Sequence, residues 1–204
     1  MATPKAIEHS PARSDRPARH RGAVLKLLPL FALLCVSSAA LAEDVAEPPG
    51  FRMDEYRAPV PATLKGAEVI DTARAEKLWR DKAAVFFDVM PRAPKPTNLP
   101  EGTIWKDKVR TDIPGSTWLA NVGYGAISPE TERYFRDGLS ARTAGDMSKP
   151  VVFYCMTDCW MSWNAAKRAL GWGYKTVLWY PPGSDGWERA GLPLEENSPY
   201  IVEK

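Results

Sequence analysis

Two cysteines four residues apart are the side chains of this sequence best suited to covalent chemistry. Cys155 follows the apolar run 151–154, and Cys159 comes just before a helix-like segment. This order predicts a buried strand, a short loop and a helix N-terminus. Unpaired backbone N–H groups and the positive end of a helix dipole favour a thiolate at such a place. We therefore expect Cys155 to be the low-pKa nucleophile and Cys159 its resolving partner, with Asp158 opposing a very low pKa by its charge.

The spacing of the two cysteines permits a disulfide. Four residues on a helix, or in a curled loop before one, bring the two Cα atoms to about 6 Å. Thiol–disulfide or persulfide chemistry is the first interpretation. A purely structural disulfide and a ligand or metal held by the two sulfurs stay open, although closing a short loop stabilises little. Copper(I) on two thiolates with Met156 or Met161 is chemically sensible. Such a set also arises by coincidence, so no metal and no firm cofactor is expected.

Residues 1–42 are predicted to be a secretory signal peptide. A basic segment precedes the apolar run 27–36, and a small-residue cleavage site ends at Ala42. The run is too short for a good transmembrane span, so no membrane span is expected after cleavage. The signal predicts a periplasmic location, where an oxidising environment favours disulfides.

Removal of this segment changes which side chains the mature protein has. The chain carries 27 basic and 25 acidic residues, and the segment holds six basic and two acidic ones, which leaves 21 and 23. A near-neutral chain gives no support for nucleic-acid binding. Both histidines, His9 and His20, also leave, as does Cys35. Cys–His and Ser–His mechanisms and histidine-ligated metal sites are thereby excluded for the mature chain.

The rest of the chain alternates strand and helix patterns. Residues 43–66 predict an extended, proline-rich lead-in, 67–196 one domain, and 197–204 a tail. We expect strands at 68–70, 84–89, 151–154 and 176–180, and a turn into a short strand at 113–119. Helices are expected at about 72–81, 128–139, 162–170 and 185–190, and residues 91–112 form an irregular insertion. The alternation predicts an α/β domain with a central, mostly parallel sheet.

Several joints in this order resemble the rhodanese-like domain. They are an aspartate-bearing strand ending at Asp88–Val89, the turn Ile113-Pro-Gly115, a strand ending on Cys155, the segment 173–178, and a closing segment from Gly186-Trp187 to Pro193. The resemblance covers roughly residues 66–196. It implies a three-layer fold and, as an alternative activity, sulfur transfer through a persulfide on Cys155.

The cysteine loop departs from the pattern of that family. A sulfur-transferring rhodanese has two arginines and a glycine after its cysteine, so that the loop holds an anion. Here the corresponding places hold Met156, Thr157, Asp158, Cys159 and Trp160. An acidic side chain opposes thiosulfate binding, and only backbone donors remain to hold it.

The sequence Cys155-x-x-x-Cys159-Trp160 behind a signal peptide resembles a narrower family. That family is named for PQQ-dependent catabolism and its CxxCW motif. The resemblance implies association with a periplasmic quinoprotein alcohol dehydrogenase or its electron carriers, with PQQ only in the partner enzyme. It supplies no reaction. If the protein is an enzyme, we expect thiol–disulfide or sulfur-transfer chemistry at Cys155. Otherwise it is a binding module with a structural disulfide.

Other residues are expected to support this loop. Trp160 is predicted to shield the cysteine pair or to wall an aromatic pocket. Asp88, at a strand end near the loop, is expected to have a structural role, with a hydrogen bond to the loop backbone as the alternative. Ser162 is expected to cap the following helix. Arg110 and Lys106 are the candidates for the positive charge that the loop lacks.

Overall fold

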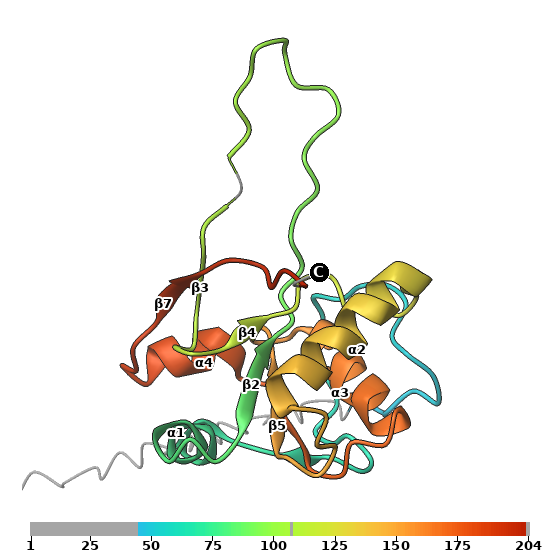
Figure 1. Cartoon of the computed structure of the whole chain (residues 1–204). Coiled ribbons are helices and arrows are strands. Elements are labelled where there is room, and N and C mark those ends of the chain that lie inside the picture. Colours follow the sequence, from blue (N-terminus) through green and yellow to red (C-terminus); the bar gives the residue numbers. More distant parts are fainter. Residues whose placement is uncertain (1–44, 107, 203–204) are drawn as a thin grey trace, which may run out of the picture. The chain divides into compact units, whose positions relative to one another are not determined.

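Five parallel strands form the central sheet (Figure 1). The computed structural model describes residues 45–106 and 108–202, so the signal-peptide prediction lies outside the described residues. The strand order is β1-β6-β5-β2-β4. The strands are β1 (Glu68–Val69), β2 (Val85–Asp88), β4 (Thr117–Trp118), β5 (Val151–Tyr154) and β6 (Val177–Tyr180). The predicted α/β class and mostly parallel sheet are confirmed.

Alternate residues of the strands face two different helical layers. Phe87, Phe153 and Trp179 share one hydrophobic cluster with residues of α2 (Pro129–Thr143) and α3 (Trp160–Gly171). Phe86, Val152, Tyr154, Leu178 and Tyr180 share the other with α1 (Thr72–Arg80) and α4 (Gly183–Arg189). Successive strand side chains point to opposite faces, and both faces are covered, which is why the strands read as unbroken apolar runs.

The helix boundaries agree closely with their sequence signals. Asp71 caps α1 by accepting from the Arg74 N–H, and Ser128 caps α2 with Pro129 in the first turn. Ala75 and Leu78 are buried on the inner side of α1. Among the described residues, no helix is long and apolar enough to cross a membrane.

The C-terminal segment is part of the fold and not a tail. Strand β7 (Glu195–Asn197) pairs antiparallel with β3 (Arg110–Asp112) in a second, two-stranded sheet. The Tyr200 N–H then donates to the Trp118 carbonyl oxygen. The sequence did not predict these strands, because both are short and polar and each is stabilised by a partner 83 to 87 residues away.

The proline-rich lead-in lies along α3, and we call residues 45–66 the strap. The Arg52 N–H donates to Asn164 Oδ1, and Asn164 Nδ2 donates back to the Arg52 carbonyl oxygen, both at 2.9 Å. Indole N–H groups of Trp160 and Trp163 donate to carbonyl oxygens of Pro59 and Thr63. These bonds hold the strap in place without any regular secondary structure of its own.

The insertion after β2 leaves the sheet and returns as β3. In Figure 1 it extends well beyond the helices and strands before it comes back (residues 91–106 and 108–109). Residues at both ends of this insertion line one cavity together with Met156, which belongs to the loop after β5.

Candidate functional site

Cys155 and Cys159 lie where β5 ends and α3 begins. Cys155 directly follows Tyr154, the last residue of β5, and Cys159 is the N-cap residue of α3. Asp158 is exposed and adopts φ 51°, a left-handed conformation that reverses the chain between the two cysteines. The helix thus begins at Trp160, two residues earlier than expected, and Ser162 is not its cap. The Ser162 hydroxyl donates to the Cys159 carbonyl oxygen and accepts the indole N–H of Trp179.

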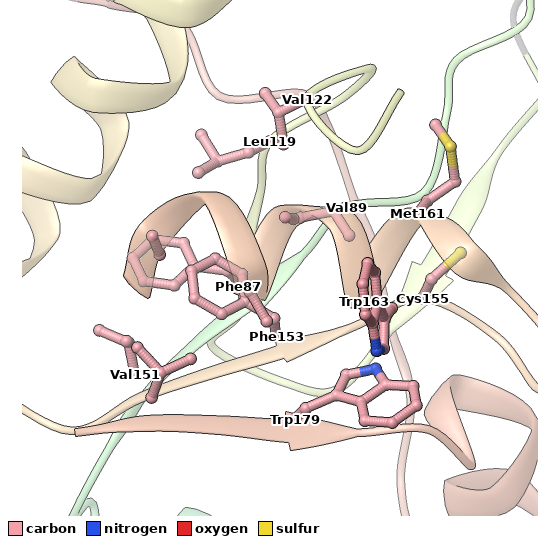
Figure 2. Packing of buried hydrophobic residues seen from close by; sticks show 14 of the residues in the cluster. Phe87, Val89, Leu119, Val122, Val151, Phe153, Cys155, Met161, Trp163 and Trp179 are labelled. Carbon is pink, nitrogen blue, oxygen red and sulfur yellow. The ribbon is translucent and has the colours of Figure 1, made fainter. Parts of the chain in front are cut away.

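Both cysteines are buried free thiols in mutual contact. Their residue exposures are 0% for Cys155 and 2% for Cys159. The Cys155 S–H has two sulfur acceptors, namely Met90 Sδ at 3.5 Å and the Cys159 sulfur. Figure 2 shows Cys155 at the end of the hydrophobic cluster where Trp163, Trp179 and Met161 are labelled, away from Val151. The two thiol groups therefore interact directly, as a reactive pair requires.

The roles of the two cysteines are the reverse of the prediction. Burial raises the pKa of Cys155 well above its ordinary value, and proximity to Cys159 raises it further. The hydrogen bond from Cys155 lowers the pKa of Cys159 to about 7, with help from the backbone N–H groups of Met161 and Met156. Cys159 occupies the helix N-terminus, whereas Cys155 lies on the buried strand. Cys159 is therefore the thiolate and Cys155 the proton donor to it.

Arg57 of the strap brings a positive charge to the loop. Its Nη1 donates to the Thr157 carbonyl oxygen at 2.8 Å, and its charge helps to lower the pKa of Cys159. The place of Arg57 at the loop was not predicted from the sequence. No local signal identifies it, because it lies 100 residues before Thr157 and is brought there only by the docking of the strap.

Two backbone donors near the loop are already occupied. The Thr157 N–H donates to Asp185 Oδ2 at 3.2 Å, and the Trp160 N–H donates to the Tyr56 carbonyl oxygen at 3.0 Å. The Thr157 hydroxyl also donates to the Pro182 carbonyl oxygen. A loop that holds a free anion needs such donors unpaired. This arrangement provides fewer of them than the sequence suggested.

Asp88 supports the loop through Arg110. The Arg110 Nε donates to Asp88 Oδ2 at 2.6 Å, and its Nη2 reaches Ser184 Oγ at 3.1 Å and the Cys155 carbonyl oxygen at 3.4 Å. Asp88 Oδ1 accepts the Met90 N–H. The expected loop contact of Asp88 is therefore indirect. The charge of Arg110 is paired with Asp88 and lies beneath the loop.

A second buried carboxyl group, Asp112, adjoins Asp88. Burial, reinforced by the charge of Asp88, raises the pKa of Asp112 to about 7. Asp112 Oδ2 accepts from Asn197 Nδ2, but Oδ1 has no hydrogen-bond partner among the described residues. Burial also raises the pKa of Asp88, while Arg110 opposes this. A proton carried by Asp112 and shared with Asp88 relieves both the repulsion and the unsatisfied oxygen.

Close backbone packing fixes the loop against α4. Met156 forms an antiparallel bridge with Gly183, and the Ser184 N–H donates to the Cys155 carbonyl oxygen at 3.0 Å. Gly183 has φ 56°, and a Cβ atom there would lie 2.6 Å from the Met156 Cα. Only glycine fits this position.

Trp160 belongs to the core and not to a pocket wall. It is 1% exposed, its ring packs edge-on against Trp163 at 5.4 Å, and Arg52 lies over its face. Its proximity to the cysteines is thus a matter of packing, and the predicted aromatic pocket at this residue is not found.

The cavity nearest to the cysteines lies on the side of Met90 and Met156. Its volume is about 460 Å³. Half of its lining residues carry cationic or indole side chains: Arg92, Trp105, Lys106, Lys108, Arg110 and Trp118. Lys106 borders this cavity, and its role as a positive charge for the loop stays a prediction. A larger hollow of about 710 Å³, with Trp79 and Phe86 in its wall, includes no residue of the cysteine loop.

No group of three or more histidine, cysteine, aspartate or glutamate side chains is arranged to hold a metal ion within the described part of the chain.

No family model matches the chain, and no curated protein matches it. Three solved structures are similar over part of it. EanB, in its complex with hercynine, is 23% identical, with a TM-score of 0.44 over 64% of this chain and 32% of EanB. The polysulfide-sulfur transferase homodimer of Wolinella succinogenes is 21% identical, with a TM-score of 0.40 over 65% of this chain and 81% of that one.

The third is Tum1 of Saccharomyces cerevisiae, at 21% identity and a TM-score of 0.39 over 61% of this chain and 44% of Tum1. The chain spans about a third of EanB and less than half of Tum1. Likeness at this level carries no inference about activity, which has to come from the site itself.

Proposed function

We propose that this is a secreted, rhodanese-like thiol–disulfide protein in which Cys159 is the attacking thiolate and Cys155 its partner. One observation carries the proposal: two buried free thiols hydrogen-bond each other where a strand meets a helix N-terminus. The chemistry of such a pair is attack of a thiolate on a sulfur and closure of the mixed disulfide by the second thiol.

The reaction balances as a two-electron step. In the oxidising direction the Cys159 thiolate attacks a disulfide of the partner and expels one partner thiolate. The Cys155 sulfur then attacks Cys159 in the mixed disulfide, forms the Cys155–Cys159 bond and releases the second partner thiolate. The pair loses two electrons, the partner disulfide gains them, and the one proton of Cys155 passes to a released partner thiolate, while the other leaves as a thiolate.

The link to periplasmic alcohol oxidation is the finer part of the proposal. It is supported by the Cys155-x-x-x-Cys159-Trp160 sequence and by the basic and apolar pattern of residues 1–42. We propose that the partner is a quinoprotein alcohol dehydrogenase system or one of its electron carriers, with PQQ held by that partner.

The redox potential of the pair is the decisive test. The protein is equilibrated in glutathione or dithiothreitol buffers and trapped with an alkylating agent, and the intact mass reports the fraction oxidised. A potential between about −120 and −270 mV, the range of thiol–disulfide oxidoreductases, supports the proposal. A potential below about −300 mV is that of a structural disulfide and overturns it.

A cellular readout complements the potential. Cys155→Ser and Cys159→Ser should each impair growth on alcohols, because each removes one half of the pair. Ser148→Ala, on an exposed turn, is the control for expression. Growth of both cysteine variants like that of the unmodified strain would contradict the assignment to alcohol oxidation.

A non-enzymatic binding role is the second candidate, favoured by the cationic, tryptophan-bearing cavity beside Met156. It predicts that Lys108→Glu abolishes partner capture while a variant lacking both cysteines retains it. Loss of capture in the double cysteine variant removes this candidate.

Sulfur transfer through a persulfide on Cys155 is the third candidate function. It is opposed by the protonated, buried Cys155 and the occupied loop donors, and a mass increase of one sulfur on the isolated protein would restore it.

A further inference from the structure

Three sulfur atoms from two segments of the chain converge at the cysteine loop. Met90 follows the end of β2, Cys155 follows β5, and Cys159 caps α3. The Cys155 sulfur lies 3.5 Å from Met90 Sδ and hydrogen-bonds the Cys159 sulfur. β2 and β5 are paired in parallel up to Asp88 and Tyr154, so the sheet register itself brings Met90 and Cys155 to the same edge.

We propose that Met90, Cys155 and Cys159 form a three-sulfur binding site for copper(I). Thiolate and thioether sulfurs are soft ligands, which select copper(I) over hard cations such as magnesium or calcium. The described residues include no histidine, so the three sulfurs have no imidazole ligand beside them. Imidazole ligands are common in zinc and copper(II) sites. This site uses the cysteines of the proposed redox function but does not rest on it.

Outer interactions hold two of the three ligands in position. The Met90 N–H donates to Asp88 Oδ1 at 2.9 Å. The Cys155 carbonyl oxygen accepts from the Ser184 N–H, the Ser184 hydroxyl and Arg110. Asp88 also anchors Arg110, so that one carboxylate restrains both ligand segments. Such outer partners orient metal ligands and tune their affinity.

The same cavity provides an entry path. Met90 and Met156 both contribute to the lining of the 460 Å³ cavity, and both are partly exposed, whereas the cysteines are buried. An ion that enters meets thioether sulfur first and thiolate sulfur behind it. Binding is a ligand exchange without electron transfer: the proton of the Cys155 S–H is released, Cys159 is already a thiolate, and the copper(I) dithiolate carries one net negative charge. Arg57 lies close enough to offset that charge.

The test is a copper(I) titration of the full, reduced protein under anaerobic conditions, in competition with bicinchoninate. One copper(I) per protein is expected, with X-ray absorption showing three sulfur neighbours. Met90→Leu conserves volume and removes only the thioether. It should weaken copper(I) binding about tenfold or more and leave two sulfur neighbours. Met147→Leu, on an exposed turn, is the matched control and should bind like the unmodified protein.

The outcomes separate this site from the redox function. Met90→Leu keeps both thiols and should still form the Cys155–Cys159 disulfide on oxidation, whereas Cys155→Ser removes both copper(I) binding and the disulfide. Equal copper(I) affinity of Met90→Leu and the unmodified protein overturns the site. A nitrogen or oxygen neighbour of copper in the unmodified protein, or only two sulfur neighbours, also overturns it. This second measurement does not depend on whether Met90→Leu folds.

Discussion

Cys159 and Cys155 differ in reactivity because one lies at a helix terminus and the other on a strand. The sequence places Cys155 at a strand end, which suggests proximity to the same helix. In the structure the loop between them moves the helix N-cap to Cys159, while Cys155 stays in the hydrophobic cluster. Burial disfavours a charged sulfur and the helix N-terminus favours one. The single negative charge of the pair is therefore carried by Cys159, with the proton on Cys155.

Arg57 gives the first prediction at this scale. Because its charge helps to lower the pKa of Cys159, Arg57→Gln should raise that pKa above about 7. Both proteins keep Cys155 and are alkylated with iodoacetamide at a series of pH values, and mass mapping gives the rate at Cys159. This rate should rise with pH at a higher midpoint in Arg57→Gln than in the unmodified protein. Arg74→Gln, in an exposed ion pair with Glu68, is the control. An unchanged midpoint in Arg57→Gln would show that the strap does not act on the sulfur.

At the scale of elements, the contact between the cysteine loop and α4 depends on one glycine. Gly183→Ala meets two costs, a positive φ and a Cβ atom 2.6 Å from the Met156 backbone. We expect a loss of about 3 kcal/mol in the free energy of unfolding and faster alkylation of the loop. Gly191→Ala shares the positive φ, but nothing lies within 4 Å of its Cβ. It should lose about 1 kcal/mol. Equal losses in urea unfolding would mean that the close contact is unimportant.

The strap gives the second prediction about elements. Asn164 exchanges two hydrogen bonds with Arg52 and donates a third to the Gly123 carbonyl oxygen. Asn164→Ala leaves these groups without their partner and should cost about 2 kcal/mol. Hydrogen exchange should increase through residues 52–60. The half-buried Thr131→Ala, in the first turn of α2, is a control that should affect only its own helix. If exchange in the strap stays slow in Asn164→Ala, other contacts hold it.

The elements also show what the sequence could predict. Strands β2, β5 and β6 are apolar runs bounded by breakers, and α1 and α2 begin at recognisable caps, so local signals suffice for them. The two cysteines likewise carry their own signal. The strap, the β3–β7 pair, Met90 and Arg57 are placed by contacts between residues far apart in the chain. No local periodicity encodes such contacts, and for this reason the third sulfur and the loop's cation were missed.

At the scale of the whole molecule, the buried pair of Asp112 and Asp88 should leave a signature in the stability of the protein. The pKa of Asp112 is raised from 3.8 to about 7 in the folded chain, mainly by burial and next by the charge of Asp88. The unfolded chain gives up this proton near pH 4, while the folded chain keeps it until about pH 7. The contribution of Asp112 to the free energy of unfolding is therefore fully present below pH 4 and is lost as the pH rises to 7.

Asp112→Asn tests this because the amide mimics the protonated acid. It can still accept from Asn197 and can donate to Asp88, but it cannot ionise. Its free energy of unfolding relative to the unmodified protein should increase between pH 4 and 7, reaching an advantage of roughly 1–2 kcal/mol above pH 7. Asp146→Asn is the control, because hydrogen bonds from Ser148 lower the pKa of Asp146, and its effect should have the opposite sign. Urea unfolding at a series of pH values measures both differences. A difference for Asp112→Asn that is independent of pH would mean that Asp112 is ionised in the folded protein, and that Arg110 neutralises two carboxylates beneath the cysteine loop.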